Sequence, residues 1–151
     1  TIFMLSCSDD GINREKYRYE FFKNSALSIN EMDGSYMKYG MISNGDKEVF
    51  KYTYVAEDNE QIADDEYAEF IHFEIDSNLN SFEIDGEDLS VAKTILTKSC
   101  FCYFPDDEEK NVNPVGTISG EKISNDTWRV NFDVTFYADE NRSFEANFVL
   151  K

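Results

Sequence analysis

Alternation of hydrophobic and polar residues dominates the chain and predicts β-strands. Residues 17–21 carry an aromatic side chain at every second position, with charged residues between. The same period of two recurs in residues 47–55 and 71–76. Because this period places successive side chains on opposite faces of a strand, each run predicts a strand with one face toward a core.

The most regular alternation closes the chain. Apolar residues occupy every second position in 128–136 and in 144–150, with a polar turn between the two runs. We expect a hairpin with one buried and one hydrated face, in which Trp128 faces the core. A strand is also expected at 115–120, before the turn at Asn125-Asp126.

Two turn signals divide the stretch from residue 27 to residue 55. Asp33-Gly34 and Asn44-Gly45 supply the residue types that tight hairpin turns require. Short turns leave no room for crossover helices, so three strands joined in this way predict an antiparallel meander. The run at 17–21 is expected to be a separate strand before it.

The remaining segments carry weaker signals. Residues 56–66 and 106–113 are acidic and polar, which indicates surface loops. Ser90–Lys98 fits either a short helix or the start of a strand that runs to Tyr103, and Pro105 ends it in both cases.

About nine or ten antiparallel strands follow from these patterns, in one domain over residues 16–151. A chain of this kind must pack two sheets face to face or curl into a barrel, since an open flat sheet leaves its edges exposed. We expect an all-β antiparallel sandwich; a lipocalin-like β-barrel is the alternative.

Charge narrows the set of partners. The chain has 31 acidic and 14 basic residues, a formal net charge of -17. Such a surface repels phosphate backbones and anionic lipid headgroups, which argues against nucleic acid and against direct docking on a membrane. The 41% hydrophobic and 15% aromatic content favours a packed fold over disorder.

The first ten residues change abruptly in character at Cys7. Residues 2–5 are apolar, Ser6 is small, and Ser8, Asp9 and Asp10 are polar or acidic, which is the order found at a processing site for secretion. The apolar run is too short to span a bilayer, which takes about 20 such residues.

Leu5-Ser6-Cys7 resembles a bacterial lipobox, although Met4 stands where leucine is usual. The resemblance implies that Cys7 is lipidated and becomes the new N-terminus. Ser8-Asp9-Asp10 resembles the export signal of surface lipoproteins of the Bacteroidota type. We therefore expect residues 1–6 to be the remnant of a signal peptide and 7–15 a lipidated polar tether. The lipid on Cys7 would anchor the protein in the outer membrane, with the β domain on the outside of the cell.

The last three strands also resemble the end of small Bacteroidota lipoproteins of unknown function, some with lipocalin-like barrels. That pattern, from Gly116 to the run at 144–150, implies no site residues.

Candidates for catalysis are sparse. His72 is the only histidine and alternates within a strand, so we expect it on an outward face. The sequence contains no G-x-S-x-G, H-E-x-x-H or G-x-G-x-x-G motif, so hydrolase, zinc-protease and dinucleotide sites lack local support. We expect no catalytic residues and no cofactor.

Cys100 and Cys102 stand at alternate positions and would point to the same side of a strand. Two thiols do not complete a zinc site, which takes four ligands, so no metal is expected. A mutual disulfide is near the limit of bridging geometry if the segment is extended, and we expect two buried thiols facing the core. Oxidation stays possible if the strand ends in a tight turn there.

Carboxylates are too abundant to mark a catalytic pair. The run Asp106-Asp107-Glu108-Glu109 lacks the spaced pattern of a calcium loop and is expected to be a solvated surface. We expect a non-enzymatic envelope module that binds a protein, a glycan or an apolar ligand. The alternatives are a small enzyme that acts on glycans through a carboxylate pair, and a carrier with an apolar cavity.

Overall fold

The protein folds into one continuous nine-stranded sheet with a single turn of helix, among the residues that the structure describes. This structure is a computed structural model, and it describes residues 16–57 and 66–151. In chain order the elements are β1 (Lys16–Glu31), β2 (Lys38–Asn44), β3 (Lys47–Val55), β4 (Tyr67–Asp76), β5 (Ser81–Asp85), α1 (Asp88–Val91), β6 (Ile95–Cys100), β7 (Val115–Ser124), β8 (Thr127–Phe136) and β9 (Glu140–Leu150).

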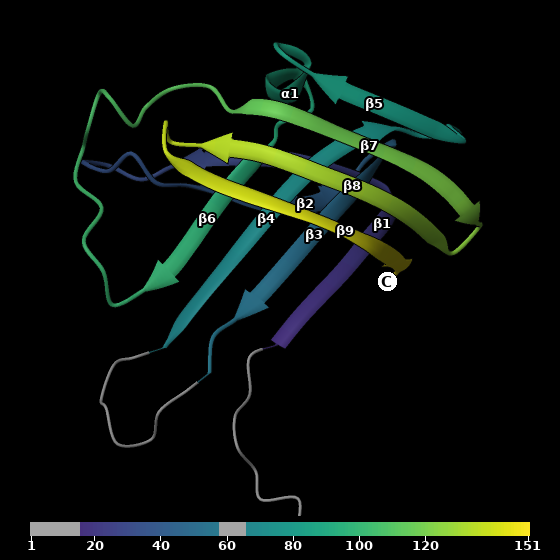
Figure 1. The fold of residues 1–151 in the computed structure, drawn as a ribbon, viewed down its shortest axis with the longest axis horizontal. Helices are drawn as coiled ribbons and strands as arrows, with labels where there is room; N and C mark the ends of the chain where they lie inside the picture. Colours follow the sequence, from purple (N-terminus) through teal and green to yellow (C-terminus); the bar gives the residue numbers. More distant parts are fainter. Residues whose placement is uncertain (1–15, 58–65) are drawn as a thin grey trace, which may run out of the picture.

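The sheet folds over so that its two halves face each other. The strand order is β5-β7-β8-β9-β1-β3-β4-β6, with β2 paired to β1 outside this path. In Figure 1 the β7-β8-β9 half crosses in front of the β3-β4-β6 half. The end strands β5 and β6 are not paired with each other, so the sheet is open and the fold is the expected sandwich-like all-β type rather than a closed barrel.

Among the described strands, every pairing is antiparallel except one. β9 meets β1 in a short parallel pairing, in which Glu20 lies opposite Val149 and Phe21 opposite Leu150. The backbone N–H of Lys151 extends this contact by donating to the carbonyl of Phe21 at 3.0 Å. A purely antiparallel domain was therefore the wrong expectation at this one place, where the two halves of the sheet join.

The hairpin predicted at Asp33-Gly34 is confirmed, but the meander predicted over residues 27–55 is wrong, because β2 and β3 do not pair with each other. β1 spans both the 17–21 run and the first arm of the expected hairpin. Its first part pairs with β3 and its second part with β2, so β2 and β3 form consecutive parts of the same opposing arm. The expected turn at Asn44-Gly45 is instead an irregularity between two strands that run in the same direction.

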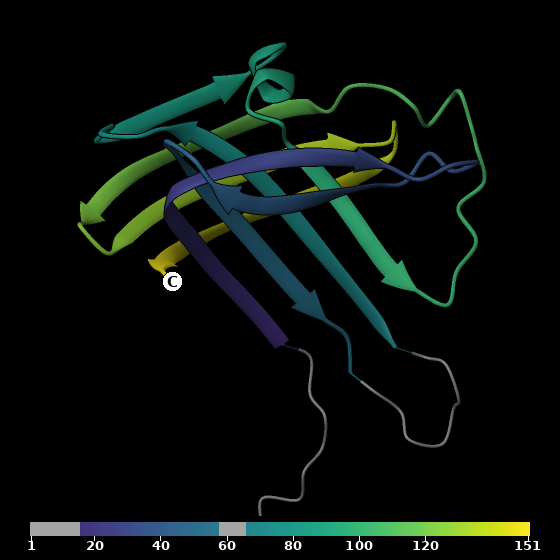
Figure 2. The same ribbon diagram turned by 180° about the vertical axis from the view of Figure 1, so that it is seen from behind.

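Close packing against β1 explains why position 45, between β2 and β3, is a glycine. A side-chain carbon there would lie 2.5 Å from the Cβ of Ala26 and 2.7 Å from the carbonyl oxygen of Ser25. On the facing strand the register shifts between Phe22 and Ser25, and Asn24 adopts a left-handed φ of 51°. Asparagine tolerates this conformation better than most residues. β1 bends here and carries its second part, with β2, across the sheet (Figure 2).

The fold therefore has three layers in its middle. Figures 1 and 2 show the β7-β8-β9 half on one side of β3-β4-β6 and the bent β1–β2 ribbon on the other. Between the two halves lies the main core, where aromatic rings from both sides meet. Its fully buried members include Phe50, Phe73, Trp128, Phe132 and Phe148. Burial of each such side chain contributes about 1.5–3 kcal/mol.

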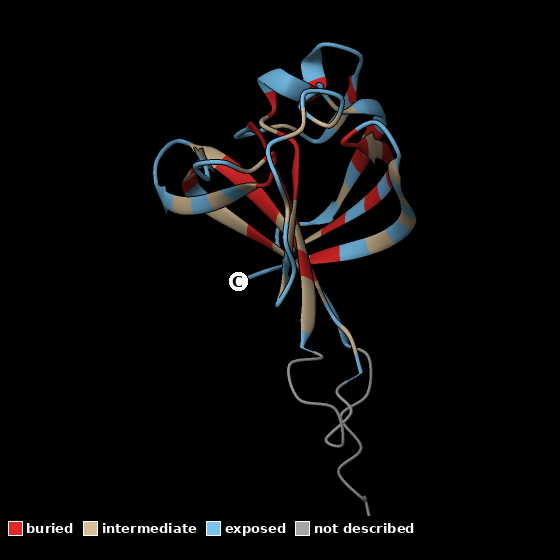
Figure 3. Ribbon diagram, turned by 90° about the vertical axis from the view of Figure 1, so that its left-hand side faces the viewer, coloured by how far each residue is buried: buried red, intermediate tan, exposed pale blue. Residues whose placement is uncertain are grey.

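The closing hairpin follows its prediction closely. β8 and β9 pair from Thr127–Val149 to Phe136–Glu140, and Trp128 is fully buried, as expected. Figure 3 shows buried and exposed positions alternating along the strands of both halves. The ambiguous Ser90–Lys98 segment divides into the end of α1 and the beginning of β6, which stops at Cys100 rather than at Tyr103.

Candidate functional site

A shallow groove rich in tyrosine lies at the end of the molecule where β1 begins. It has a volume of about 240 Å³ and is formed by β1, β3, β4 and β9. The lining residues are Tyr17, Tyr19, Tyr52, Tyr54, Glu69, Arg142, Ser143 and Phe144. Four neighbouring phenol rings and one ion pair thus form a single surface feature.

Strand pairing explains why the four tyrosines meet. Tyr17 lies opposite Tyr54, and Tyr19 lies opposite Tyr52, in the antiparallel β1–β3 pair. The ring centroids are 4.9 Å apart in the first pair and 5.6 Å apart in the second. These separations are those of favourable tilted aromatic contacts. The period of two therefore builds the aromatic floor of the groove.

β9 supplies the facing wall. The ring of Phe144 stacks on Tyr52 with a centroid distance of 5.1 Å and an angle of 14°, and it also contacts Tyr19 at 5.5 Å. Tyr17 is 50% exposed and lies at the outer rim. The inner end of the groove is therefore continuous with the packed aromatic core, and its outer end is open to solvent at Tyr17.

An ion pair crosses the groove between the two halves of the sheet. The Nε and Nη2 atoms of Arg142 donate to the two carboxylate oxygens of Glu69, each at 2.8 Å. The Tyr67 hydroxyl donates to the same carboxylate at 2.8 Å. Two parallel hydrogen bonds fix the plane of the guanidinium, which makes this pair more rigid than a single contact.

These contacts set the protonation states in the groove. Burial raises the pKa of Glu69, but the hydrogen bonds from Arg142 and Tyr67 outweigh it and leave the pKa below its ordinary value. Burial, followed by the charge of Glu69, raises the pKa of Tyr52; burial and the hydrogen bond to Glu69 raise that of Tyr67. The groove therefore offers neutral phenols and a charged but internally balanced ion pair.

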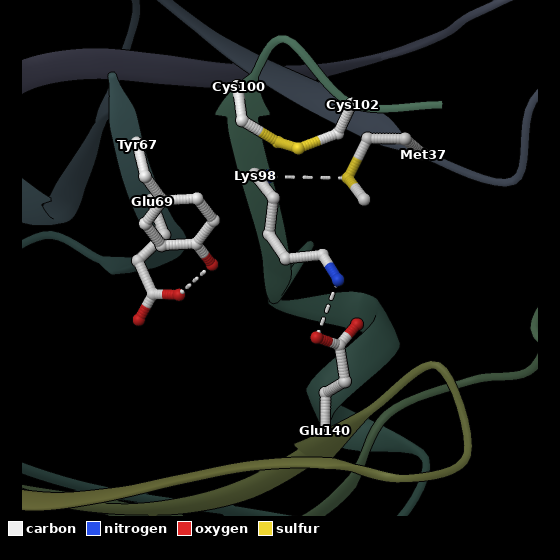
Figure 4. Close-up of a disulfide and its surroundings, with 7 residues drawn as sticks. All are labelled: Met37, Tyr67, Glu69, Lys98, Cys100, Cys102 and Glu140. Atoms are coloured by element: carbon white, nitrogen blue, oxygen red, sulfur yellow. Dashed lines mark hydrogen bonds and ion pairs between the residues drawn. A yellow bond between two sulfur atoms is a disulfide. The ribbon is translucent and has the colours of Figure 1, made fainter. Parts of the chain in front are cut away.

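The ion pair continues into a second one below the end of β6. Lys98 Nζ lies 2.6 Å from Glu140 Oε1, and Arg142 Nη2 lies 3.9 Å from the same oxygen. Figure 4 shows Lys98 extended toward Glu140 below the Cys100–Cys102 disulfide. Lys98 also lies over the ring of Phe104, 5.0 Å from its centroid. These charged side chains connect β4, β6 and β9.

Cys100 and Cys102 form a disulfide, so the prediction of two buried thiols is wrong. β6 ends at Cys100, and the turn that follows brings the two Cα atoms to 5.1 Å, within the range that a disulfide bridges. Phe101 between them is 88% exposed. This is the case that the sequence left open, in which the strand ends in a tight turn.

His72 is buried, so its expected outward position is also wrong. The bent β1–β2 ribbon covers that face of β4, and a side-chain carbon on Gly40 would lie 3.0 Å from His72 Nδ1. Burial, with a smaller effect of Lys51, lowers the pKa of His72 to about 4. In the described part of the chain, no group of three or more His, Cys, Asp or Glu side chains is arranged to hold a metal ion.

The groove could be predicted only in part. Each of its tyrosines falls on the core-facing row of its strand, and the greater frequency of tyrosine over phenylalanine toward these strand ends is the one signal of an uncovered surface. Glu69 and Arg142 are 73 positions apart, and neither stands in a motif. The N-terminal candidates Cys7, Ser8, Asp9 and Asp10 lie outside the described residues.

Comparison with known proteins gave no match: no family model, no curated protein and no solved structure is significantly similar to this chain. Within residues 16–57 and 66–151, no helix is long and apolar enough to cross a bilayer. Function is therefore inferred from the chemistry of the groove and from the N-terminal sequence.

Proposed function

We propose that the chain is a non-enzymatic lipoprotein of the cell envelope whose β domain binds an uncharged saccharide in the tyrosine groove. The observation that carries this proposal is the row of exposed or partly exposed Tyr17, Tyr19 and Tyr54, which pack on the buried Tyr52 beside the Glu69–Arg142 pair. Phenol rings present flat apolar faces with a polar edge, which suits the C–H faces and hydroxyls of a sugar ring.

The polar groups of the groove support a ligand with several hydroxyls. Arg142 and Glu69 hold each other in fixed orientations, and Ser143 lies beside them. Groups that are already oriented lose little conformational entropy when they bind a ligand. A few fixed polar groups on an aromatic surface are typical of small-molecule and cofactor sites.

Charge favours a neutral saccharide. The chain carries a formal charge of -17, which repels anionic polymers over a Debye length of roughly 8–10 Å. Inside the groove, the charge of Arg142 is balanced by Glu69 at 2.8 Å. No uncompensated positive charge from the lining residues is available to recruit an acidic sugar.

The position of the groove fits a tethered protein. Tyr17 at its rim follows Lys16, the first described residue, and Lys16 follows Cys7 by nine positions. Nine residues span at most about 30 Å when fully extended. If Cys7 carries the lipid, the groove stays close to the membrane surface, where envelope glycans are concentrated.

The two alternatives receive less support. A glycosidase uses two carboxyl groups that face each other across the ligand, roughly 5–10 Å apart. The described lining of the groove has one carboxylate, Glu69, and its ion pair keeps it charged. A carrier needs a hollow interior, whereas aromatic side chains fill the space between the halves of this sheet.

A glycan array tests the saccharide proposal. We expect the labelled 151-residue chain to bind a subset of neutral glycans. Tyr17→Ala should weaken that binding about two- to twelvefold, because one aromatic contact contributes about 0.5–1.5 kcal/mol. Tyr17→Phe should retain it, since the ring face is kept. Tyr39→Ala is the matched control, an exposed tyrosine outside the groove.

Two outcomes would contradict the saccharide proposal. One is an array on which no neutral glycan binds above background. The other is a bound glycan whose affinity is the same for Tyr17→Ala as for the unsubstituted chain.

Lipidation is tested separately on the full precursor. Labelled fatty acid should be incorporated into the precursor and lost on Cys7→Ala substitution. Cys102→Ala is the control for a substituted cysteine outside the lipobox-like sequence. Equal incorporation by Cys7→Ala would refute the anchor and leave the saccharide proposal intact.

A further inference from the structure

A second cavity, of about 140 Å³, lies near the opposite end of the β6 layer from the groove. It is enclosed by the start of β2, the junction of α1 with β6, residues 110–114 and the end of β8. In Figure 1 the loop between β6 and β7 passes the turn between β1 and β2 before it reaches β7. The backbone N–H of Tyr36 donates to the carbonyl of Pro105 at 3.3 Å and fixes this approach.

The lining of this cavity differs in charge from the rest of the protein. Lys38, Lys93 and Lys110 line it, and the described lining residues include no Asp or Glu. The whole chain has more than twice as many acidic as basic residues. Three of its 14 basic side chains thus gather around one small cavity. A lining whose charged side chains, among the described residues, are all lysines favours an anionic ligand.

Two of these lysines are available to a ligand despite their ion pairs. Lys38 lies 3.9 Å from Glu31, and Lys110 lies 2.6 Å from Asp139, and both carboxylates are largely exposed. Surface pairs of this kind contribute little, because water solvates both charges well. Lys93 is held more firmly, by Glu74 at 2.9 Å and the carbonyl of Leu27 at 2.8 Å.

The polar groups beside the lysines include one buried hydroxyl and two amide side chains. Thr94 lines the cavity and is 3% exposed, yet its Oγ1 has no hydrogen-bond partner among the described residues. Burial of a hydroxyl without a partner is unfavourable. Because this Oγ1 is closed off even from water, a ligand in the cavity does not reach it, and the hydroxyl is not part of the site. Asn111 and Asn113 add further polar groups to the lining.

The rest of the lining is apolar and limits the size of the ligand. Ile29, Ile95 and Phe136 contribute to it. A cavity of about 150 Å³ in another protein holds benzene, so this one suits about six to nine non-hydrogen atoms. We propose that it binds a small aliphatic carboxylate, with the carboxylate at Lys38 and Lys110 and the hydrocarbon chain against the apolar wall.

Titration with hexanoate, followed by NMR of the isotope-labelled chain, tests the proposal. We expect saturable shifts of the amides of Thr94, Ile95 and Val112, complete below roughly 10 mM because so small a ligand has few atoms with which to bind. Residues of the tyrosine groove, such as Tyr54, should not shift. Absence of saturable shifts at the cavity would overturn the proposal.

Three substitutions assign the contacts. Lys110→Gln should weaken hexanoate binding at least threefold through loss of one charge. Lys38→Gln should weaken binding to a similar extent for the same reason. Lys47→Gln is the matched control, because Lys47 also pairs with an exposed carboxylate, on Asp76, but lies outside the cavity. Equal binding by all three variants would contradict the assignment.

Two other probes separate the roles of charge and of apolar contact. We expect 1-hexanol and inorganic phosphate each to bind at least tenfold more weakly than hexanoate. If hexanol binds as well, recognition of the carboxylate is wrong. If phosphate binds as well, the apolar wall plays no part and the proposed ligand class is wrong.

Discussion

The two faces of the β3-β4-β6 layer are both covered, but by different kinds of residue. On the inner face, Phe50 and Phe73 stack at 4.7 Å and contact rings from the opposite half of the sheet, such as that of Phe148. Hydrogen bonds contribute little there, because the side chains are almost entirely hydrocarbon. Packing and the hydrophobic effect hold this core.

The outer face forms a second core of mixed composition beneath the β1–β2 ribbon. Its members are Leu27, Val49, His72, Glu74 and Ile95. Glu74 accepts a hydrogen bond from the backbone N–H of Leu27 at 2.9 Å and pairs with Lys93. This core therefore depends on specific polar contacts as well as on packing.

The difference shows that burial on the two faces has separate origins. The inner face is buried because two halves of one sheet with matching alternation meet. The outer face is buried only because β1 bends at Asn24 and returns over β4. The stability of the inner core should fall when side-chain volume is lost and change less when a side chain is replaced by another of equal volume. The stability of the outer core should fall when a buried charged group is removed and should depend on pH.

Phe50→Ala should have the largest effect. Phe50 is fully buried and its ring contacts five other aromatic rings, so truncation leaves a cavity in the centre of the main core. We expect the free energy of unfolding to fall by about 3–5 kcal/mol. Urea unfolding followed by the fluorescence of Trp128, the single tryptophan, measures it. A loss below about 1 kcal/mol would contradict a tightly packed core.

Glu74→Leu tests the second core and should cost about 2–3 kcal/mol, because it leaves the Leu27 N–H buried without an acceptor and removes the partner of Lys93. Hydrogen exchange should become faster at Leu27 and stay unchanged at Val130. Glu145→Leu, on the exposed face of β9, is the matched control and should change stability by less than about 0.5 kcal/mol. If the Leu27 amide exchanges at the same rate in Glu74→Leu and Glu145→Leu, the outer core does not depend on the polar contacts of Glu74.

Acid should destabilise the second core through His72. Its pKa is about 4 in the folded protein and about 6.5 when unfolded, so the unfolded state binds the proton first as pH falls. Stability is therefore full above pH 6.5 and declines toward pH 4, by about 2 kcal/mol between pH 7 and pH 5. His72→Gln should lack this component, and the difference between the two urea titrations measures it. Parallel pH dependences would show that His72 does not titrate across this range.

Sequence patterns predicted the inner core well because it depends on local periodicity. In residues 128–136 and 144–150 the apolar residues at every second position show which face of each strand is buried. That face needs only another apolar face to pack against. Trp128 was placed correctly for this reason. The all-β fold follows from the same signal, but the single open sheet that folds over itself does not.

The outer core and the groove depend on contacts between distant segments, which periodicity does not encode. His72 and Glu74 alternate with apolar residues exactly as exposed polar residues would, and only the bend in β1 buries them. The Glu69–Arg142 pair joins β4 and β9 without any local motif. The disulfide likewise depends on where β6 ends, since two cysteines in an extended strand lie further apart.

A matched pair of substitutions should show the most specific difference between the two faces. Thr53 lies on the outer face of β3, is buried, and has no partner for its Oγ1 among the described residues. Thr53→Val replaces that hydroxyl with a methyl group of similar size, so stability should stay the same or rise by up to about 1 kcal/mol. Val130→Thr makes the reverse change in the fully buried inner core and should cost about 1–3 kcal/mol, since it buries a hydroxyl among hydrocarbon groups. Urea unfolding of both variants compares them directly. A loss of stability in Thr53→Val as large as that in Val130→Thr would mean that the outer face depends on its hydroxyls, through a contact such as bound water, and not only on Glu74.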